Sequence, residues 1–107
     1  MRLESSAPAE IVSVAGDRLA VRGALTFATA RRASEAGLRE IGAASARLLT
    51  VDLAAVTAAD SAGLAVCLVW LSSAKRAGRE LRFSNLPAHI RSLARISEVD
   101  SLLERGA

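Results

Sequence analysis

The stretch V-D-L-A-A-V-T-A-A-D-S-A-G-L-A-V, residues 51–66, decides the fold of this chain. It begins inside residues 48–53, which are typical of a covered central strand because they are mostly apolar on both faces. After a short loop, the side chain of Asp60 or of Ser61 can cap a helix that runs to about residue 77. The segment therefore predicts a strand, a loop and a helix in direct succession.

The start of this helix is the most informative part of the chain. It presents free backbone N–H groups, a partial positive charge and the Ser61 hydroxyl, while Gly63 lets another backbone come close. A plain helix cap is the simpler interpretation, but both Asp60 and Ser61 are present where one cap suffices. Residues 64–71 are also apolar all round. We expect the surplus, Trp70 above all, either to meet another helix or to form a docking surface.

The elements before this segment follow from local patterns. Residues 1–10 are polar and small, and we expect a flexible tail there. Residues 11–14 and 19–22 form a hairpin around a Gly-Asp turn, and residues 28–43 form an amphipathic helix with Thr26 or Thr29 as its N-cap. The apolar stripe of this helix comprises Phe27, Ala30, Ser34, Gly37, Leu38 and Ile41.

Beyond Gly78, which ends the second helix, residues 81–84 predict another strand and residues 88–96 a third helix. Val99, Leu102 and Leu103 would close the core. The order β-β-α-β-α-β-α calls for right-handed crossovers, and so for an α/β fold with about four strands in a mixed sheet covered by helices. One domain over residues 11–104 accounts for the chain.

Composition excludes several classes of function. The net charge is only +3 and the aromatic content 3%, which disfavours nucleic-acid binding. With one His and one Cys, the chain can build neither a disulfide framework nor a thiolate zinc site. Asp52 and Asp60 are separated by a loop and lack a His or Cys partner, so we expect no catalytic residue, no metal and no cofactor.

Other polar residues have simple interpretations. Cys67 lies within the apolar run and is predicted to be an inert core thiol. His89, with Arg91 and Arg95 after it, could contribute to a basic rim, but a solvated helix face is the simpler interpretation. Arg76, Arg79 and Arg82 could contact an acidic partner or lipid headgroups.

Nothing in the sequence predicts membrane insertion. The start, M-R-L-E-S-S-A-P-A-E, lacks the apolar core of a secretory signal. The longest apolar run, residues 64–71, is far shorter than the roughly 20 residues that span a bilayer. We therefore expect a cytoplasmic domain.

The pattern D-L-x-x-V-x-x-x-D-S-x-G-L, followed by a helix that ends in A-K-R-A-G, resembles a STAS domain from about Ile11 to Leu103. That family contains bacterial anti-sigma-factor antagonists, the cytoplasmic tails of sulfate-type anion transporters, and standalone subunits of phospholipid-trafficking ABC transporters of the Mla type. The resemblance implies the STAS fold and a domain that acts by binding a protein partner.

The branch of the family depends on a single position. In the antagonists the motif resembles D-S-S-G, and a partner kinase phosphorylates the second Ser; here that position is Ala62, although Ser61 remains a candidate phosphoacceptor. D-S-A-G and the segment G-A-L-T-F-A-T-A, residues 23–30, resemble the transporter branch instead.

This resemblance implies a non-catalytic subunit docked on the transporter's ATPase at the cytoplasmic face of the inner membrane, in indirect contact with the permease, and serving outer-membrane lipid asymmetry. The expected partner-binding residues are Asp60, Ser61, Ala62, Gly63, Leu64 and Trp70. A phosphorylation-controlled anti-sigma-factor antagonist is the alternative. An anion binder at the helix N-terminus is a third reading, but it lacks a second polar cluster.

Overall fold

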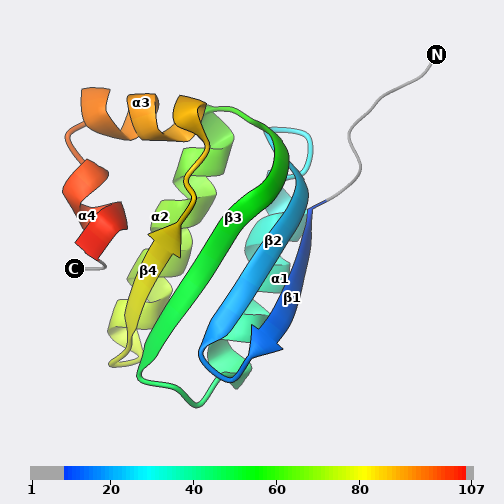
Figure 1. Cartoon of the computed structure of the whole chain (residues 1–107), viewed down its shortest axis with the longest axis vertical. Coiled ribbons are helices and arrows are strands. Elements are labelled where there is room, and N and C mark those ends of the chain that lie inside the picture. Colours follow the sequence, from blue (N-terminus) through cyan, green and yellow to red (C-terminus); the bar gives the residue numbers. More distant parts are fainter. Residues whose placement is uncertain (1–8, 106–107) are drawn as a thin grey trace.

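A four-stranded sheet with helices packed against it makes up the molecule (Figure 1). The computed structural model describes residues 9–105, so most of the predicted flexible tail lies outside the described residues. The strands are β1 (Glu10–Ala15), β2 (Arg18–Leu25), β3 (Leu48–Ala59) and β4 (Glu80–Ser84). The helices are α1 (Ala30–Ala43), α2 (Ser61–Arg76), α3 (Ala88–Ile96) and α4 (Asp100–Arg105).

The sheet has the order β1-β2-β3-β4 and is mixed. β1 and β2 form the predicted antiparallel hairpin, whereas β2–β3 and β3–β4 are parallel pairs. Each parallel pair needs a crossover, and α1 and α2 supply the two. Because crossovers are right-handed and the strands are added in one direction, both helices lie on the same face of the sheet (Figure 1). The predicted α/β fold class is confirmed.

β3 was expected to be covered on both faces, but the face of the sheet away from α1 and α2 is only partly covered. Leu49, Val51 and Leu53 are buried, but the alternating residues Thr50 and Asp52 are only partly buried. Within residues 49–53 the strand therefore turns its apolar side chains toward the helices and its two polar ones, Thr50 and Asp52, to the far side, so this part is not apolar on both faces. The reason is topological, since no helix crosses over to the far side of β3 (Figure 1).

The strands are longer than predicted, β2 for example extending to Leu25, and the differences at α1 and β3 matter most for the site. α1 begins at Ala30 rather than at residue 28, and Phe27, expected on its apolar stripe, precedes it and is 85% exposed. The residues of α1 that are buried are Ala33, Gly37 and Ile41. β3 continues to Ala59 where a loop was expected, so the strand leads directly into the start of α2.

The C-terminal end of the core is closed by an additional short helix. α4 packs beside β4 and brings Leu103 into the core, whereas Leu102 stays 38% exposed. Among residues 9–105, no helix is long and apolar enough to cross a membrane.

The contact between α1 and α2 is built around Trp70. Its side chain is 1% exposed, and its indole N–H donates to the carbonyl of Ser34 at 3.1 Å. Gly37, in the next turn of α1, lies directly against the indole ring, and a Cβ at that position would overlap it. The large ring thus fits only because α1 presents a bare backbone there.

Replacing Gly37 by Ala should lower the free energy of unfolding by about 1–3 kcal/mol, because the added methyl group overpacks the Trp70 site. Gly42 is the matched control in the same helix, since a Cβ there meets nothing within 4 Å. Gly42→Ala should be neutral or stabilising by up to about 1 kcal/mol. Urea denaturation of both variants measures the difference, and equal stabilities would contradict the overpacking argument.

Candidate functional site

The candidate site lies where β3 ends and α2 begins. Asp60 has extended backbone (φ −141°, ψ −167°), and its Oδ1 accepts the N–H of Ala62 at 2.9 Å. Asp60 is therefore the N-cap of α2, which decides between the two caps that the sequence allowed. Ser61 is the first residue of the helix, and its side chain is left exposed to solvent.

The second carboxylate oxygen of Asp60 has another function. Oδ2 accepts, at 3.0 Å, the backbone N–H of Phe27, which lies in the loop between β2 and α1. Local sequence patterns cannot reveal this long-range bond. The signal in the sequence was that both Asp60 and Ser61 are present where one cap suffices. The structure shows that Asp60 both caps α2 and binds the second segment.

Gly63 allows the same two segments to come together. A Cβ on this residue would lie 2.5 Å from the carbonyl oxygen of Leu25, at the end of β2. The prediction that Gly63 permits a close backbone approach is confirmed, and the approaching backbone belongs to the chain itself. Any side chain at this position would push α2 away from β2.

Only part of the expected partner-binding set is accessible. Ser61 is exposed, and Asp60 and Ala62 are partly buried. Gly63 and Leu64 are buried, with Leu64 only 7% exposed.

Trp70 was also expected to bind a partner, but it is buried. Its side chain is enclosed between α1 and α2, so it serves the core and cannot contact a partner. The prediction left both outcomes open, because an apolar helix does not reveal which of its sides a neighbouring helix covers.

The exposed face of α2 has an unusual composition. Ser61, Ala65, Val69 and Ser72 are exposed at spacings of four, four and three residues, which places them on one side of the helix. Charged residues occur on α2 only in the last turn, at Lys75 and Arg76. A helix face turned to water normally carries charged side chains along its length, so this uncharged face is suited to contact with another protein.

The polar groups elsewhere do not converge on a chemical site. Asp52 lies on the open face of the sheet, where hydrogen bonds from Asn85 and from the Ala54 N–H lower its pKa, with a further contribution from Arg18. It lies roughly 25 Å along the chain from Asp60, given the rise of an extended strand. The two carboxylates therefore cannot act together as an acid–base pair.

The remaining candidates serve structure or solvent. Burial raises the pKa of the Cys67 thiol to about 12, so the prediction of an unreactive core thiol is confirmed. Arg79 donates to the carbonyl of Ile41 at the end of α1 and is therefore used within the fold, while Arg76 and Arg82 stay exposed. In the described part of the chain, no group of three or more His, Cys, Asp and Glu residues could hold a metal ion.

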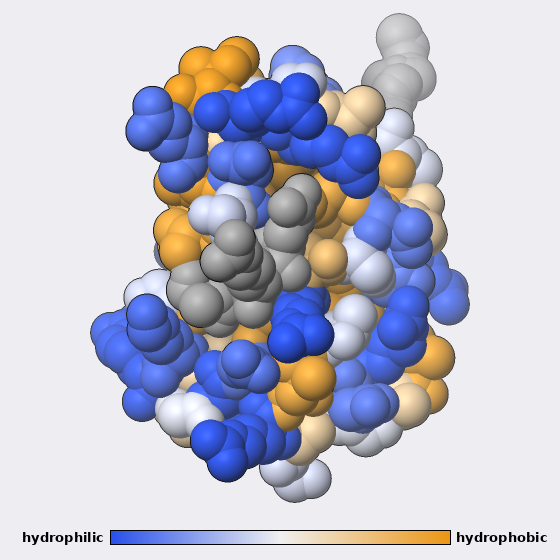
Figure 2. Space-filling view, turned by 60° about the vertical axis from the view of Figure 1, so that its left-hand side comes forward, coloured by the Kyte–Doolittle hydropathy of each residue, from blue (hydrophilic) through white to orange (hydrophobic). Residues whose placement is uncertain are grey.

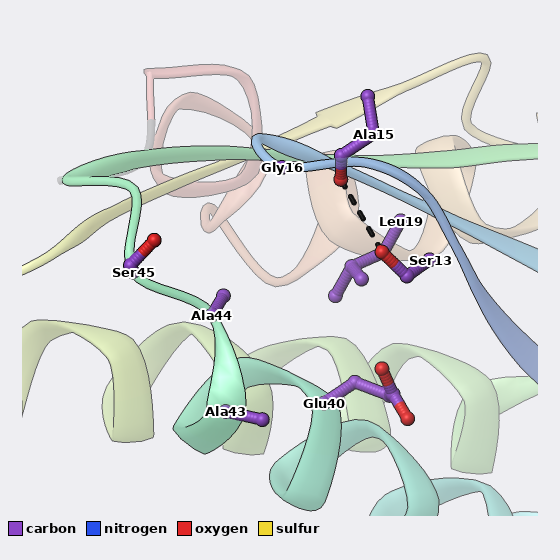
Figure 3. A pocket seen from close by; sticks show the side chains of 8 residues that line it. All are labelled: Ser13, Ala15, Gly16, Leu19, Glu40, Ala43, Ala44 and Ser45. Atoms are coloured by element: carbon purple, nitrogen blue, oxygen red, sulfur yellow. Dashed lines mark hydrogen bonds between the residues drawn. The ribbon is translucent and has the colours of Figure 1, made fainter.

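A pocket of about 220 Å³ lies at the opposite end of the molecule (Figure 3). It is formed between the β1–β2 turn and the end of α1, and Glu40 is the one charged residue among those that line it. None of residues 60–64 contributes to it. The pocket is therefore separate from the candidate site.

On the side of the molecule that carries α3 and α4, hydrophilic and hydrophobic residues are interspersed (Figure 2). Its hydrophobic residues appear there as separate small groups among hydrophilic ones. This agrees with the exposure of His89, Arg91 and Arg95 on α3, as predicted for a solvated helix face.

Asp60→Ala should lower the free energy of unfolding by about 1–2 kcal/mol, because α2 loses its cap. Asp60→Asn should lower the free energy of unfolding less, since Asn is also a good N-cap, but its NH2 group replaces one of the two oxygens and faces an N–H donor, so one of the two hydrogen bonds is lost. We expect hydrogen exchange at the Phe27 N–H to accelerate in both variants.

Ser61→Ala, which removes only an exposed hydroxyl, is the control and should alter neither the free energy of unfolding nor hydrogen exchange at the Phe27 N–H. Unchanged exchange at Phe27 in Asp60→Ala would refute the bridging role of the carboxylate.

Comparisons with known proteins place the chain in a family. The family model described as Mlab, STAS domain matches residues 12–104. No curated protein matches the sequence significantly.

Solved structures agree with this fold. The unphosphorylated form of the anti-sigma factor antagonist SpoIIAA has a TM-score of 0.62 and 12% identity, and the match covers 82% of each chain. A candidate anti-sigma factor antagonist from Thermotoga maritima has a TM-score of 0.67 and 17% identity, and the match covers 91% of this chain and 82% of the other. At these identities the likeness concerns the fold, and the family model carries the assignment. The chain belongs to the Mlab-type family of STAS domains.

Proposed function

We propose that this STAS domain is a non-catalytic subunit that binds the cytoplasmic ATPase of a phospholipid-trafficking ABC transporter, one that maintains outer-membrane lipid asymmetry. The observation that carries the proposal is the uncharged exposed face of α2, which begins at Ser61 and is held in place by Asp60. The family description, Mlab, supports the choice of transporter.

The domain would act through binding alone. If it binds the assembled or nucleotide-competent ATPase more tightly than other states, it stabilises that state by its difference in affinity. Ser61 would contribute a hydrogen bond near the centre of the contact, and the small residues Ala62 and Ala65 would let the partner approach closely. Contact with the permease would be indirect, and the cytoplasmic location follows from the partner.

An anti-sigma-factor antagonist is the second candidate, because Ser61 is exposed and could accept a phosphate. Ala62 speaks against it, since it has no hydroxyl at the position that the antagonists phosphorylate. Incubation with the host's anti-sigma-type Ser/Thr kinase and ATP should leave the mass unchanged. A gain of about 80 Da, the mass of one phosphoryl group, would favour the antagonist.

A tagged full-length chain, purified from its host at moderate salt, tests the proposal directly. Mass spectrometry of the co-purifying proteins should identify an ABC-type ATPase together with its permease. Recovery of a small Ser/Thr kinase in their place would contradict the transporter assignment.

Substitutions at Ser61 should weaken binding to the purified ATPase in a graded manner. Ser61→Ala removes one hydrogen bond and should raise Kd about 2- to 10-fold. Ser61→Glu adds a charge and bulk at the contact and should raise Kd further, by at least about 10-fold. Isothermal titration calorimetry measures both values.

Ser45→Ala is the matched control, because Ser45 is also exposed but lies beyond the other end of α1. It should bind like the wild type. Wild-type affinity in both Ser61 variants would remove Ser61 from the contact.

A further inference from the structure

Phe27 is the outlier among the aromatic residues of the chain. It is 85% exposed, whereas Trp70 is 1% and Phe83 is 8% exposed. Burial of an aromatic ring is a large source of stability, and this ring contributes none of it to the fold. An isolated exposed apolar residue is common, so exposure by itself does not indicate a function.

The backbone around Phe27 is held in an unusually defined conformation. Its N–H is bound by Asp60 Oδ2, and Thr29 N–H donates to the Thr26 carbonyl at 3.0 Å. The Thr29 hydroxyl accepts from Thr26 N–H at 3.0 Å and donates to the Ala24 carbonyl at 2.6 Å. Thr29 is itself only 6% exposed. The loop thus presents the ring from a fixed backbone, and such preorganisation lowers the entropy cost of binding.

The charge next to Phe27 breaks a local rule of helix stability. Arg31 and Arg32 are exposed in the first turn of α1, where the helix dipole disfavours cations, and that turn contains no acidic residue. Arg31 is 3.7 Å from Glu35, but their side chains are 92% and 58% exposed, so this pair contributes little. Residues that destabilise their own helix, and make no compensating contact within the protein, are expected at functional surfaces.

The same end of the molecule is positively charged beyond α1. α3 begins there as well (Figure 1), with Arg91 exposed and no acidic residue in its first turn. The Asp60 carboxylate contributes one negative charge at this end, but the exposed guanidinium groups of Arg31, Arg32 and Arg91 outnumber it. A partner that meets this end therefore gains from carrying negative charge.

We propose that Phe27 is the anchor of the contact with the ATPase, and that it inserts into an apolar pocket surrounded by acidic residues. This inference rests on the proposed function and adds to it the chemistry of the partner's surface. Arg31 and Arg32 form the charged rim, which guides association, while the ring supplies most of the affinity.

A protein pocket explains these features better than a lipid surface does. Stable membrane binding needs several apolar side chains or a dense basic cluster. Here the chain offers a single ring: Phe27 is followed by Ala28, and Asp60, which binds the Phe27 N–H, is followed by Ser61 and Ala62. One ring on a hydrogen-bonded backbone, with no other large apolar side chain beside it in the sequence, matches a pocket of limited size.

Calorimetric titration of the full-length chain against the purified ATPase tests the anchor. Phe27→Ala should raise Kd at least about 30-fold, the range of an interface hot spot, and Phe27→Leu should raise it less. Both variants should keep the wild-type Tm, because the ring lies outside the core. Val14→Ala is the matched control, because Val14 is a β1 residue that is 60% exposed near the β1–β2 turn, at the opposite end of the sheet from Phe27. This substitution should change Kd less than twofold.

Charge reversal tests the rim. Arg31→Glu should slow association about 10-fold at low salt, and this difference should shrink as salt is added. Arg39→Glu makes the same change on the same helix about 12 Å further along, and it should have a smaller effect.

Each result separates the two proposals. If the wild type binds the ATPase and Phe27→Ala binds equally well, the anchor is refuted and the proposed function stands. If the wild type does not bind, both are refuted. If Phe27→Ala keeps its affinity for the ATPase but loses co-sedimentation with phosphatidylglycerol vesicles that the wild type shows, the ring serves a membrane and the inference is overturned.

Discussion

The carboxylate of Asp60 connects the parts on which the functional surface depends. One oxygen caps α2 and the other binds the N–H of Phe27, so the end of β3, the start of α2 and the β2–α1 loop become one unit. Gly63 permits this arrangement by leaving room for the Leu25 carbonyl. Ser61 and Phe27, far apart in sequence, are thereby presented together on a fixed backbone.

The topology determines where this unit lies. Strands added in one direction through right-handed crossovers place α1 and α2 on one face, and the helices that follow parallel strands all begin at the same end of the sheet (Figure 1). Helix starts, connecting loops and their exposed side chains therefore gather there. The opposite end, with the hairpin turn and the pocket beside α1, has a different composition and no part in the site.

A binding function suits this construction better than a chemical one. The polar groups that could take part in catalysis are dispersed: Asp52 is engaged on the open sheet face, Cys67 is buried and Asp60 is used to hold the backbone. What the site offers is the uncharged exposed face of α2 and one exposed ring, Phe27, with Arg31 and Arg32 beside it. STAS domains of the Mlab type and anti-sigma factor antagonists share the fold, so the branch depends on surface residues such as Ser61 and Ala62.

Much of the fold and the centre of the site could be predicted from local chemistry. The strand–helix order, the N-cap at residue 60 or 61, the need for Gly63 and the inert Cys67 all follow from short-range patterns, because caps, turns and periodicity involve neighbouring residues. The resemblance of the motif to the family added the hypothesis that the start of α2 binds a partner.

The tertiary structure alone decided which apolar residues are covered. Trp70 is enclosed because Gly37 of α1 meets it, and Phe27 is exposed because α1 begins after it. Thr50 and Asp52 of β3 are only partly covered because both crossover helices lie on the other face of the sheet. By itself, the sequence determined the elements and the position of the site; the neighbours that bury or expose each side chain depend on packing between segments distant in the chain, which periodicity does not encode.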